Sequence, residues 1–221
     1  QTVNSYRWSD GGKTFRLSDL LVGLDAIDGL DRIKFVTSYP RDMTTDLIEA
    51  VRDLPHVSHY IHVPAQHGSD AVLKRMKRGY TIGQYMEMLG RLREAIPHVA
   101  VSSDFIVGFP GESKDDFMGT MDIINEVRFD ESFSFIYSPR PNTTASDMPD
   151  DVSEEEKKER LNILQDRLNQ LSFGFSRKKV GTVQNCLIHG QSKRDPGQLQ
   201  GRTICNRIVN FSSNDIDLVG Q

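Results

Sequence analysis

Cysteine is scarce in this sequence, and its scarcity excludes several classes of protein. Only Cys186 and Cys205 occur among the 221 residues, too few for a disulfide framework. They also fall short of the three or four protein ligands that an iron–sulfur or structural zinc site requires. No apolar run approaches the roughly 18 residues of a membrane span, and Gln1 opens no signal-peptide pattern. We therefore expect a cytoplasmic protein with no membrane partner.

Low-complexity sequence is missing as well. Nine prolines and 17 glycines, with 37% hydrophobic and 26% charged residues, describe an ordinary globular protein rather than a fibrous or disordered one. The glycine-rich dinucleotide fingerprint, the phosphate-loop lysine motif and the nucleophile elbow are all absent. The length allows a sizeable core in one large domain or two small ones.

Charge divides the chain into two parts. Residues 1–176 contain 20 Lys and Arg against 28 Asp and Glu, a net −8, whereas residues 177–210 contain 7 against 1, a net +6. The basic residues of the second part are Arg177, Lys178, Lys179, Lys193, Arg194, Arg202 and Arg207. Such a cluster suits a phosphate-bearing partner, although a solvated surface that lacks acids would give the same count.

From residue 30 to about residue 137, short β-branched or aromatic runs alternate with helical patterns. This alternation is typical of βαβ units and a parallel sheet. The predicted strands cover residues 32–37, 59–63, 99–107 and 131–137. The predicted helices cover residues 17–27, 45–53, 70–76, 82–95 and 114–127. Because an open parallel sheet usually begins with a strand, the opening helix suggests a strand-bearing portion upstream of Gln1.

Two further segments follow the predicted sheet. A polar stretch with three prolines leads to a long helix, which begins with a capping box of Ser153 and Glu156. Its apolar stripe, which we expect to pack across the sheet rather than against a coiled-coil partner, comprises Leu161, Leu164, Leu168, Leu171 and Phe175. Short alternating runs then predict a truncated all-β module with strands at residues 182–189, 198–203, 206–211 and 215–219. The predicted domains are residues 1–151, 152–179 and 180–221.

The run from Val101 to Ser113 carries the most information about a site. Its alternation puts Val101, Phe105 and Val107 on one face; the other face holds Ser102, Asp104, Ile106 and Gly108. A carboxylate inside a sheet is costly unless a ligand or a basic group engages it. Gly108 and Gly111 remove side chains where the strand turns into the helix, at the strand end where such folds bind ligands. A tight turn alone would also explain these glycines.

A second run, residues 61–70, also ends a strand and begins a helix. Gln66 and Ser69 offer neutral hydrogen-bonding groups there, and the helix start offers free N–H groups to an anion. The nearby histidines are His56, His59, His62 and His67. Strand alternation separates His59 from His62, so we expect core or rim histidines rather than a metal site.

Several stretches together resemble the radical S-adenosylmethionine methylthiotransferases over nearly the whole chain. They are residues 1–6, 35–40, 62–70, 102–112, 134–141, 201–203 and 206–211. The resemblance is closest to the tRNA branch, which adds a methylthio group to C2 of isopentenyl-adenosine beside the anticodon, at position 37, by radical chemistry. The ribosomal-protein branch, which modifies an aspartate, and a non-catalytic RNA-binding or scaffolding fragment are the alternatives. An unrelated barrel enzyme would need a complete strand set and a phosphate-binding loop.

The resemblance implies a fold, cofactors and partners. The fold is an incomplete (βα)6 radical-SAM barrel with parallel strands, followed by a linker helix and the first part of a TRAM-like β module. The cofactors are S-adenosylmethionine and two [4Fe-4S] clusters, and the partners are a tRNA anticodon loop and an electron donor. The Cys-x3-Cys-x2-Cys loop and the upstream cysteines that hold the clusters are absent. The chain is therefore expected to be a fragment that is inactive by itself.

The resemblance also implies roles for individual residues. The strand end at residues 106–110 would lie along the adenine of S-adenosylmethionine, with Gly108 allowing close approach. The expected cofactor-binding residues are Gln66, Ser69, Ser103, Asp104, Ile106, Gly108, Phe109 and Pro110. Arg140 is expected near the substrate mouth, and the seven basic residues after residue 176 are expected to contact RNA. No catalytic residue or metal ligand is assigned.

Overall fold

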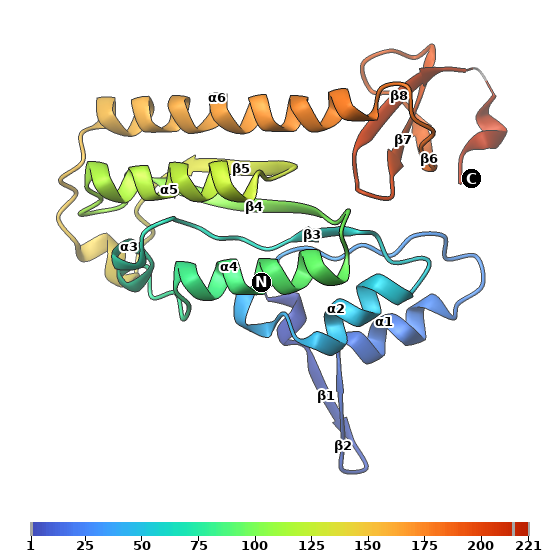
Figure 1. The fold of residues 1–221 in the computed structure, drawn as a ribbon, viewed down its shortest axis with the longest axis horizontal. Helices are drawn as coiled ribbons and strands as arrows, with labels where there is room; N and C mark the ends of the chain where they lie inside the picture. Colours follow the sequence, from blue (N-terminus) through green and yellow to red (C-terminus); the bar gives the residue numbers. More distant parts are fainter. Residues whose placement is uncertain (1, 214, 221) are drawn as a thin grey trace.

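Three short parallel strands form the central sheet of the computed structural model, which describes residues 2–213 and 215–220 (Figure 1). The strands are β3 (Tyr60–His62), β4 (Ala100–Val107) and β5 (Glu131–Ile136), in the order β3–β4–β5. Ile61 lies beside Val101, and Asp104 lies beside Phe133. Since the strands run the same way, their carboxyl ends meet at one edge, where ligands bind in folds of this kind.

Helices connect and cover these strands. They are α1 (Leu17–Asp25), α2 (Thr45–Asp53), α3 (Asp70–Arg75), α4 (Ile82–Ala95) and α5 (Lys114–Val127). The bounds predicted for α2, α4 and α5 are confirmed residue for residue, while α1 and α3 end slightly before their predicted ends. Reciprocal capping explains two of the starts, since Thr81 pairs with Gln84 and Ser113 with Asp116. Shorter 3-10 turns are η1 (Val3–Ser5), η2 (Pro40–Asp42) and η3 (Thr144–Asp147).

Alternation along β4 decides which of its side chains join the core. Val101, Phe105 and Val107 are completely buried, whereas Asp104 and Ile106 are half-buried on the other face. The predicted division of the strand into two faces is therefore confirmed for these residues. Burial of apolar area on the first face is the main favourable contribution to folding. The second face remains available to line a site.

Residues 32–37 do not form the strand that the sequence predicts. Ile33 makes one isolated parallel bridge with Val57, and Ser38 donates its N–H to the carbonyl oxygen of His62 at 3.0 Å. The segment therefore bonds to the region of β3 only near its own two ends. That prediction is wrong because a β-branched run cannot show whether a neighbouring strand supplies a continuous ladder.

A hairpin near the amino end is absent from the sequence-based prediction. β1 (Arg7–Asp10) and β2 (Lys13–Arg16) pair in antiparallel fashion, and the hairpin projects from the rest of the molecule in Figure 1. Gly11 and Gly12, both with positive φ, form its two-residue turn. This Gly-Gly pair between two short runs is the sequence signal that could have revealed the hairpin.

The long helix α6 (Glu154–Lys179) lies along β5 and α5 and leads to the C-terminal sheet (Figure 1). Its predicted apolar stripe is confirmed at Leu164, Leu168 and Leu171, which are buried in the core. The predicted capping box is only half formed. Ser153 accepts the N–H of Glu156 at 3.2 Å, but the carboxylate of Glu156 pairs with Arg160 instead. Within the described residues, no helix is long and apolar enough to cross a bilayer.

A small antiparallel sheet follows α6. It consists of β6 (Cys186–Gln191), β7 (Gln198–Thr203) and β8 (Ile208–Ser212), in that order. The strand predicted at residues 198–203 is confirmed, and its neighbours begin later than predicted. The strand predicted at residues 215–219 is wrong, because a 3-10 turn, η4 (Ile216–Leu218), occupies it. Asp215 accepts the N–H of Asp217 and so caps that turn.

The turn between β7 and β8 attaches this sheet to the rest of the molecule. Arg32 donates to the carbonyl oxygen of Arg202 at 2.8 Å, and Lys34 donates to the Asn206 side chain at 3.2 Å. Arg207 donates to Ser176 of α6 at 2.7 Å and to Asp130, just before β5, at 3.2 Å. These contacts lie toward the amino ends of the parallel strands, so the opposite edge of the parallel sheet stays open.

Candidate functional site

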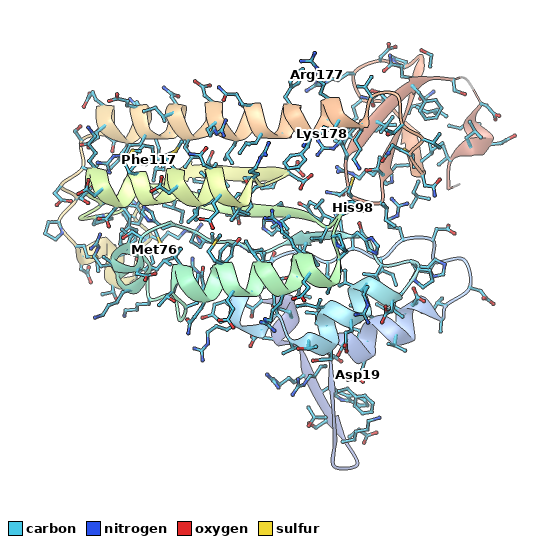
Figure 2. All side chains as sticks on the ribbon, viewed as in Figure 1. Asp19, Met76, His98, Phe117, Arg177 and Lys178 are labelled. Atoms are coloured by element: carbon cyan, nitrogen blue, oxygen red, sulfur yellow. The ribbon has the colours of Figure 1, made fainter. Side chains whose placement is uncertain are left out.

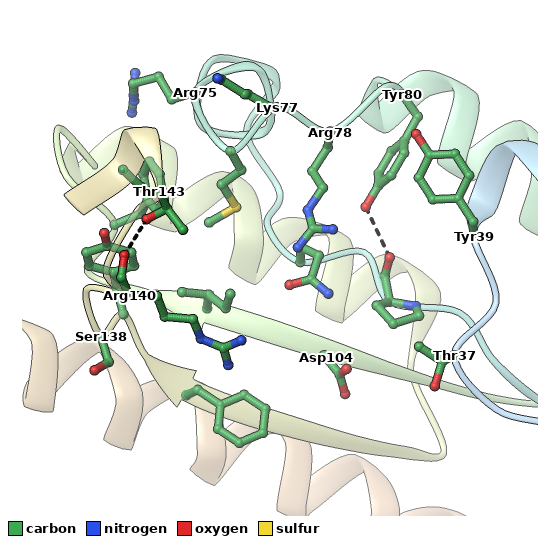
Figure 3. Close-up of a pocket in the computed structure, with 18 of the residues that line it drawn as sticks. Thr37, Tyr39, Arg75, Lys77, Arg78, Tyr80, Asp104, Ser138, Arg140 and Thr143 are labelled. Carbon is green, nitrogen blue, oxygen red and sulfur yellow. Dashed lines mark hydrogen bonds between the residues drawn. The ribbon is translucent and has the colours of Figure 1, made fainter. Parts of the chain in front are cut away.

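A pocket of about 680 Å³ lies at the carboxyl ends of the three parallel strands (Figure 3). Pockets of roughly 300–1,000 Å³ are typical of small-molecule sites. The structure brings five of the predicted site residues together in its lining: Gln66, Asp104, Ile106, Phe109 and Arg140. The strand-end location predicted from the sequence is thus where the pocket forms.

The floor of the pocket combines one carboxylate with apolar side chains. Asp104 and Ile106 of β4 lie beside Phe133 and Phe135 of β5, and Phe135 also lines the pocket. Asp104 Oδ2 is 3.4 Å from Nε2 of His62. The carboxylate therefore has a basic neighbour on one side and the pocket on the other. This mixture suits a ligand with both an aromatic surface and hydrogen-bond donors.

Two further side chains, those of Ser102 and Tyr60, position the imidazole of His62. Its Nδ1 lies 2.8 Å from Oγ of Ser102, which in turn donates to the hydroxyl oxygen of Tyr60 at 2.7 Å. All three side chains are buried. The polar side chains predicted on this face of β4, Ser102 and Asp104, therefore have polar partners within the protein. Of the two, Asp104 is the one that lines the pocket.

Three lining residues, Thr37, Gln66 and Lys77, adopt backbone conformations that L side chains rarely occupy, and Lys77 has φ of 55°. Thr37 has φ of 66° and Gln66 has φ of 69°. Such left-handed residues cost about 1–3 kcal/mol each and gather at functional sites. Gln66 is held there by β4, since its N–H donates to Asp104 O at 2.9 Å and its carbonyl oxygen accepts from Ile106 N–H at 2.9 Å. Gln66, which was predicted to contact the cofactor, is therefore one of the residues with a strained backbone.

Unsatisfied polar atoms also gather around this pocket. Ser38 Oγ and the Tyr137 hydroxyl are buried without a hydrogen-bond partner among the described residues, and both residues line the pocket. Tyr80, a third lining residue, donates to the carbonyl oxygens of Pro64 and Ala65, each at 3.1 Å. Burial raises the pKa of Tyr80 to about 12, so its phenol remains a donor near neutral pH. Two hydroxyl groups thus remain available to a ligand.

Ser103 and Pro110, two further predicted site residues, lie outside this lining. Ser103 is completely buried on the core face of β4, where its Oγ accepts the N–H of Ala65 at 2.8 Å. Its place follows from alternation, because it shares the parity of Val101 and Phe105. Pro110 is buried in the turn after β4 and is not among the lining residues.

Gly108 also lies away from the lining, and its missing side chain makes room for Lys157 of α6. A Cβ built on Gly108 would approach Cδ of Lys157 to 2.9 Å and Cγ even more closely. Gly108 also has φ of 70°, which favours glycine. In this structure the glycine therefore admits a helix side chain; the close approach of an adenine that the resemblance implies stays a prediction.

The turn after β4 is held by a buried charged cluster that sequence reasoning missed. Glu112, with a fully buried side chain, accepts the N–H of Phe109 at 3.0 Å and lies 3.1 Å from Nη1 of Arg160. Arg160 also donates to the Glu112 carbonyl oxygen at 3.0 Å, and Nε2 of His67 is 3.7 Å from the carboxylate. The cluster connects α6 to the turn that carries Phe109, and Phe109 packs edge-on against Tyr137 at 5.0 Å.

Ser69, another predicted cofactor-binding residue, caps the start of α3 and makes its hydrogen bonds within the protein. Its hydroxyl accepts the N–H of Val72 and donates to the carboxylate of Asp116, which also accepts the N–H of Ser113 at 3.0 Å. Burial alone would raise the pKa of Asp116, but hydrogen bonds from Ser69 and Ser113, together with the charge of Arg75, lower it below its usual value. Asp116 therefore ties α3 to α5 as an anion.

Asp116→Asn is expected to destabilise the chain by about 1 kcal/mol at pH 7, because hydrogen bonds to a charged acceptor are stronger than those to a neutral amide. Because the pKa of Asp116 is lower in the folded protein than in the unfolded chain, its ionised carboxylate stabilises the fold at pH values above the unfolded pKa. This stabilisation is lost as the pH falls through the folded pKa. Urea unfolding at pH 7 and near pH 3 should show the difference between Asp116→Asn and the wild type shrinking at low pH. A difference that stays constant with pH would contradict the ionised role of Asp116.

The seven basic residues predicted after residue 176 occupy a different region from the pocket. Arg177, Lys178 and Lys179 are exposed at the end of α6, two of them labelled in Figure 2, and Lys193 and Arg194 are exposed between β6 and β7. Arg202 donates to the Asn206 carbonyl oxygen at 2.9 Å, and Arg207 holds the sheet against α6 as described above. In Figure 1, α3 and the segment entering α6, which border the pocket, lie at the other end of α6.

Metal ligands do not gather at the pocket. The two cysteines, Cys186 and Cys205, belong to the C-terminal sheet and its β7–β8 turn. Across the part of the chain that the structure describes, no group of three or more His, Cys, Asp or Glu side chains could hold a metal ion. The residues present therefore do not fit an iron–sulfur cluster.

Similarity to known proteins extends over the whole chain. The family model of the Radical SAM superfamily matches residues 5–124. The tRNA-2-methylthio-N(6)-dimethylallyladenosine synthase of Saccharophagus degradans is 48% identical over 221 residues, which cover 100% of this chain and 49% of that protein. The protein of the same name from Shewanella loihica is 52% identical over 217 residues, covering 97% and 45%. The chain thus spans about half the length of the curated relatives it matches.

A solved structure shares the fold. Coproporphyrinogen III oxidase from Escherichia coli, described as a radical SAM enzyme, has a TM-score of 0.55 with 16% sequence identity, covering 85% of this chain and 50% of that one. At this identity the likeness concerns the fold alone. The predicted fold class, a parallel α/β sheet of the radical-SAM kind followed by a small all-β module, is confirmed.

Proposed function

The chain belongs to the Radical SAM superfamily, and we propose from this premise that it forms the core of a tRNA methylthiotransferase. The reaction would add a methylthio group to C2 of isopentenyl-adenosine at position 37, next to the anticodon. One observation carries the proposal: the strand ends that resemble this family are the ones that line the pocket. Identities of 48% and 52% to relatives named for this reaction support the substrate class.

The pocket suits S-adenosylmethionine, the cofactor that the superfamily implies. The apolar side chains of Ile106, Phe109 and Phe135 offer surfaces to an adenine ring. Asp104 would accept from a ribose hydroxyl or the methionine amino group, and the free hydroxyls of Ser38 and Tyr137 supply further polar contacts. When bound, the cofactor supplies the radical chemistry. The residues of this chain would bind it, orient it and exclude water.

The superfamily also implies a [4Fe-4S] cluster, which the residues of this chain do not fit. We propose that the parent protein holds two such clusters outside these 221 residues and takes electrons from a donor protein. The chain by itself would then bind ligands in the cytoplasm without turnover. The missing cluster ligands equally favour a second candidate, a non-catalytic RNA-binding role for the chain. The ribosomal-protein branch receives no support from the relatives described above.

Titration calorimetry of the 221-residue chain with S-adenosylmethionine tests the cofactor assignment. The wild type is expected to bind one equivalent. Asp104→Asn is expected to weaken binding roughly tenfold, because the amide keeps an acceptor oxygen but loses the charge that strengthens the hydrogen bond. Asp122→Asn, on the exposed side of α5 outside the pocket, serves as the matched control and should bind like the wild type. Absence of saturable binding to the wild type would overturn the proposal, and equal affinities would remove Asp104 from the site.

A further inference from the structure

The mouth of the pocket carries positive charge in an otherwise acidic region. Arg75, at the end of α3, and Lys77 and Arg78, just after it, line one wall, and Arg140, in the loop after β5, lines the opposite one. Asp104 is the one acidic residue in this lining. Residues 1–176 as a whole have a net charge of −8, so these four cations run against the local composition. The run Lys74-Arg75-Met76-Lys77-Arg78, which spans the end of α3, is the sequence signal that could have revealed three of them.

Two of these cations are committed to holding loops together. Arg75 donates to the carbonyl oxygen of Gly111 at 2.8 Å and lies 3.6 Å from the carboxylate of Asp116. Lys77 donates to the hydroxyl of Thr144 at 2.7 Å. Their positions at the mouth are therefore defined by contacts with the turn after β4 and with η3.

The other two cations point into the pocket and lack a protein counter-charge. Within the described part of the chain, the guanidinium groups of Arg78 and Arg140 make no hydrogen bond and no ion pair. Figure 3 shows both side chains extending into the pocket, Arg78 from the segment after α3 and Arg140 from the loop after β5. Both residues are exposed, so water solvates them in the absence of a ligand. Two guanidinium forks that line one pocket offer several N–H donors to an oxyanion bound between them.

We propose that Arg78 and Arg140 form a clamp for a backbone phosphate of the RNA substrate. This inference rests on the proposed function and adds to it the residues that hold the RNA strand as a base enters the pocket. A base leaves its stack most easily in a single-stranded loop, and holding the neighbouring phosphate fixes the path of that strand. The clamp lies on the pocket itself and includes Arg140, which was predicted near the substrate mouth, whereas the seven basic residues predicted after residue 176 lie toward the far end of α6.

The carboxylate of S-adenosylmethionine is the other anion that such a clamp could receive. Position favours the phosphate, since both arginines occupy the exposed mouth while Asp104 and the apolar groups lie on the floor. Lys77, which forms no ion pair among the described residues, and Arg75 also line the mouth, so it holds more cations than one carboxylate needs. A group of several cations suits a chain of phosphates.

Fluorescence anisotropy with a labelled anticodon stem-loop RNA tests the clamp on the full 221-residue chain. Arg78→Gln and Arg140→Gln are each expected to weaken RNA binding roughly 5- to 10-fold and to reduce the salt dependence by about one phosphate contact. Arg140→Lys keeps the charge but loses the fork, and we expect an intermediate effect. Arg52→Gln is the matched control, because Arg52 is exposed on α2, pairs with Asp53 and does not line the pocket.

Parallel titrations with S-adenosylmethionine distinguish the two anions. The clamp predicts weaker RNA binding with unchanged cofactor affinity in both glutamine variants. Weaker cofactor binding with unchanged RNA binding would assign the arginines to the carboxylate and overturn the clamp, as would variants that behave like Arg52→Gln. If the wild-type chain binds no RNA at any salt concentration, the proposed tRNA function itself fails, and the clamp fails with it.

Discussion

Alanine in place of Gly108 is expected to destabilise the chain by about 2–5 kcal/mol. The left-handed backbone at this position, with φ of 70°, costs an L residue roughly 1–2 kcal/mol. The new Cβ would also meet Lys157, with its Cδ 2.9 Å away and its own Cβ 3.2 Å away, and overpacking of this kind costs about 1–3 kcal/mol. Urea unfolding, followed by circular dichroism, measures the combined loss in the free energy of unfolding.

Lys157 has little freedom to move away from the new methyl group. Its side chain is 2% exposed, and its Nζ donates to Asp150 at 2.6 Å and to Glu154 at 2.9 Å. Displacing it would break two charged contacts or shift the start of α6. The turn after β4 would move as well, so we expect weaker binding of S-adenosylmethionine through displacement of Phe109 rather than through contact with the adenine.

Gly29→Ala separates backbone strain from the steric contact. Gly29 has φ of 81°, and a Cβ built on it meets nothing within 4 Å, so only the backbone cost of about 1–2 kcal/mol should appear. Adding Lys157→Ala to Gly108→Ala should recover part of the lost stability, because contacting residues are not additive. Equal losses for Gly108→Ala and Gly29→Ala would show that Lys157 is not what requires glycine at position 108.

Glu112→Ala is expected to cost about 3–5 kcal/mol, the range found when one partner of a buried ion pair is removed. Arg160 would keep Glu156 as its partner but lose the buried carboxylate 3.1 Å from its Nη1. The N–H of Phe109 would lose its acceptor inside the protein. Because Phe109 lines the pocket, binding of S-adenosylmethionine should weaken together with stability.

One further variant of the cluster and one control outside it test whether charge or shape is responsible. Glu112→Gln keeps an acceptor for Phe109 but removes the charge opposite Arg160, so an intermediate loss of stability is expected. Glu126→Ala, on the exposed side of α5, should change the free energy of unfolding by no more than about 0.5 kcal/mol. A loss for Glu112→Ala as small as that of the control would exclude the cluster as the support of the turn.

Local sequence patterns predicted the elements that depend on nearby residues. Helices α4 and α5 begin where Thr81 and Ser113 cap them, and the residues that cap a helix lie within one turn of its start. Alternation along β4 likewise separated Asp104 from Phe105 and would have put Ser103 on the core face had it been applied there. Gln66 and Arg140 reached the pocket because each follows a strand end.

Contacts between distant segments escaped these patterns. Residues 32–37 have strand-like composition, but a strand also needs a neighbour with a continuous ladder, which lies elsewhere in the chain. The basic residues after residue 176 were expected to contact RNA, and folding commits one of them, Arg207, to Asp130. Arg78, which the sequence patterns did not single out, lines the same pocket as Arg140. Charge composition says which side chains are available and nothing about where they meet.

The sequence by itself determined the helices, the two faces of the central strand and the family to which the chain is similar. Each of these depends on residue types at short separations, where propensity, capping and alternation act. Only the tertiary structure decided that Lys157 fills the space beside Gly108, that Glu112 is buried against Arg160, and that two arginines converge on the pocket. These contacts arise because α6 packs along the sheet and several loops meet at its carboxyl edge, and no short-range periodicity encodes that packing.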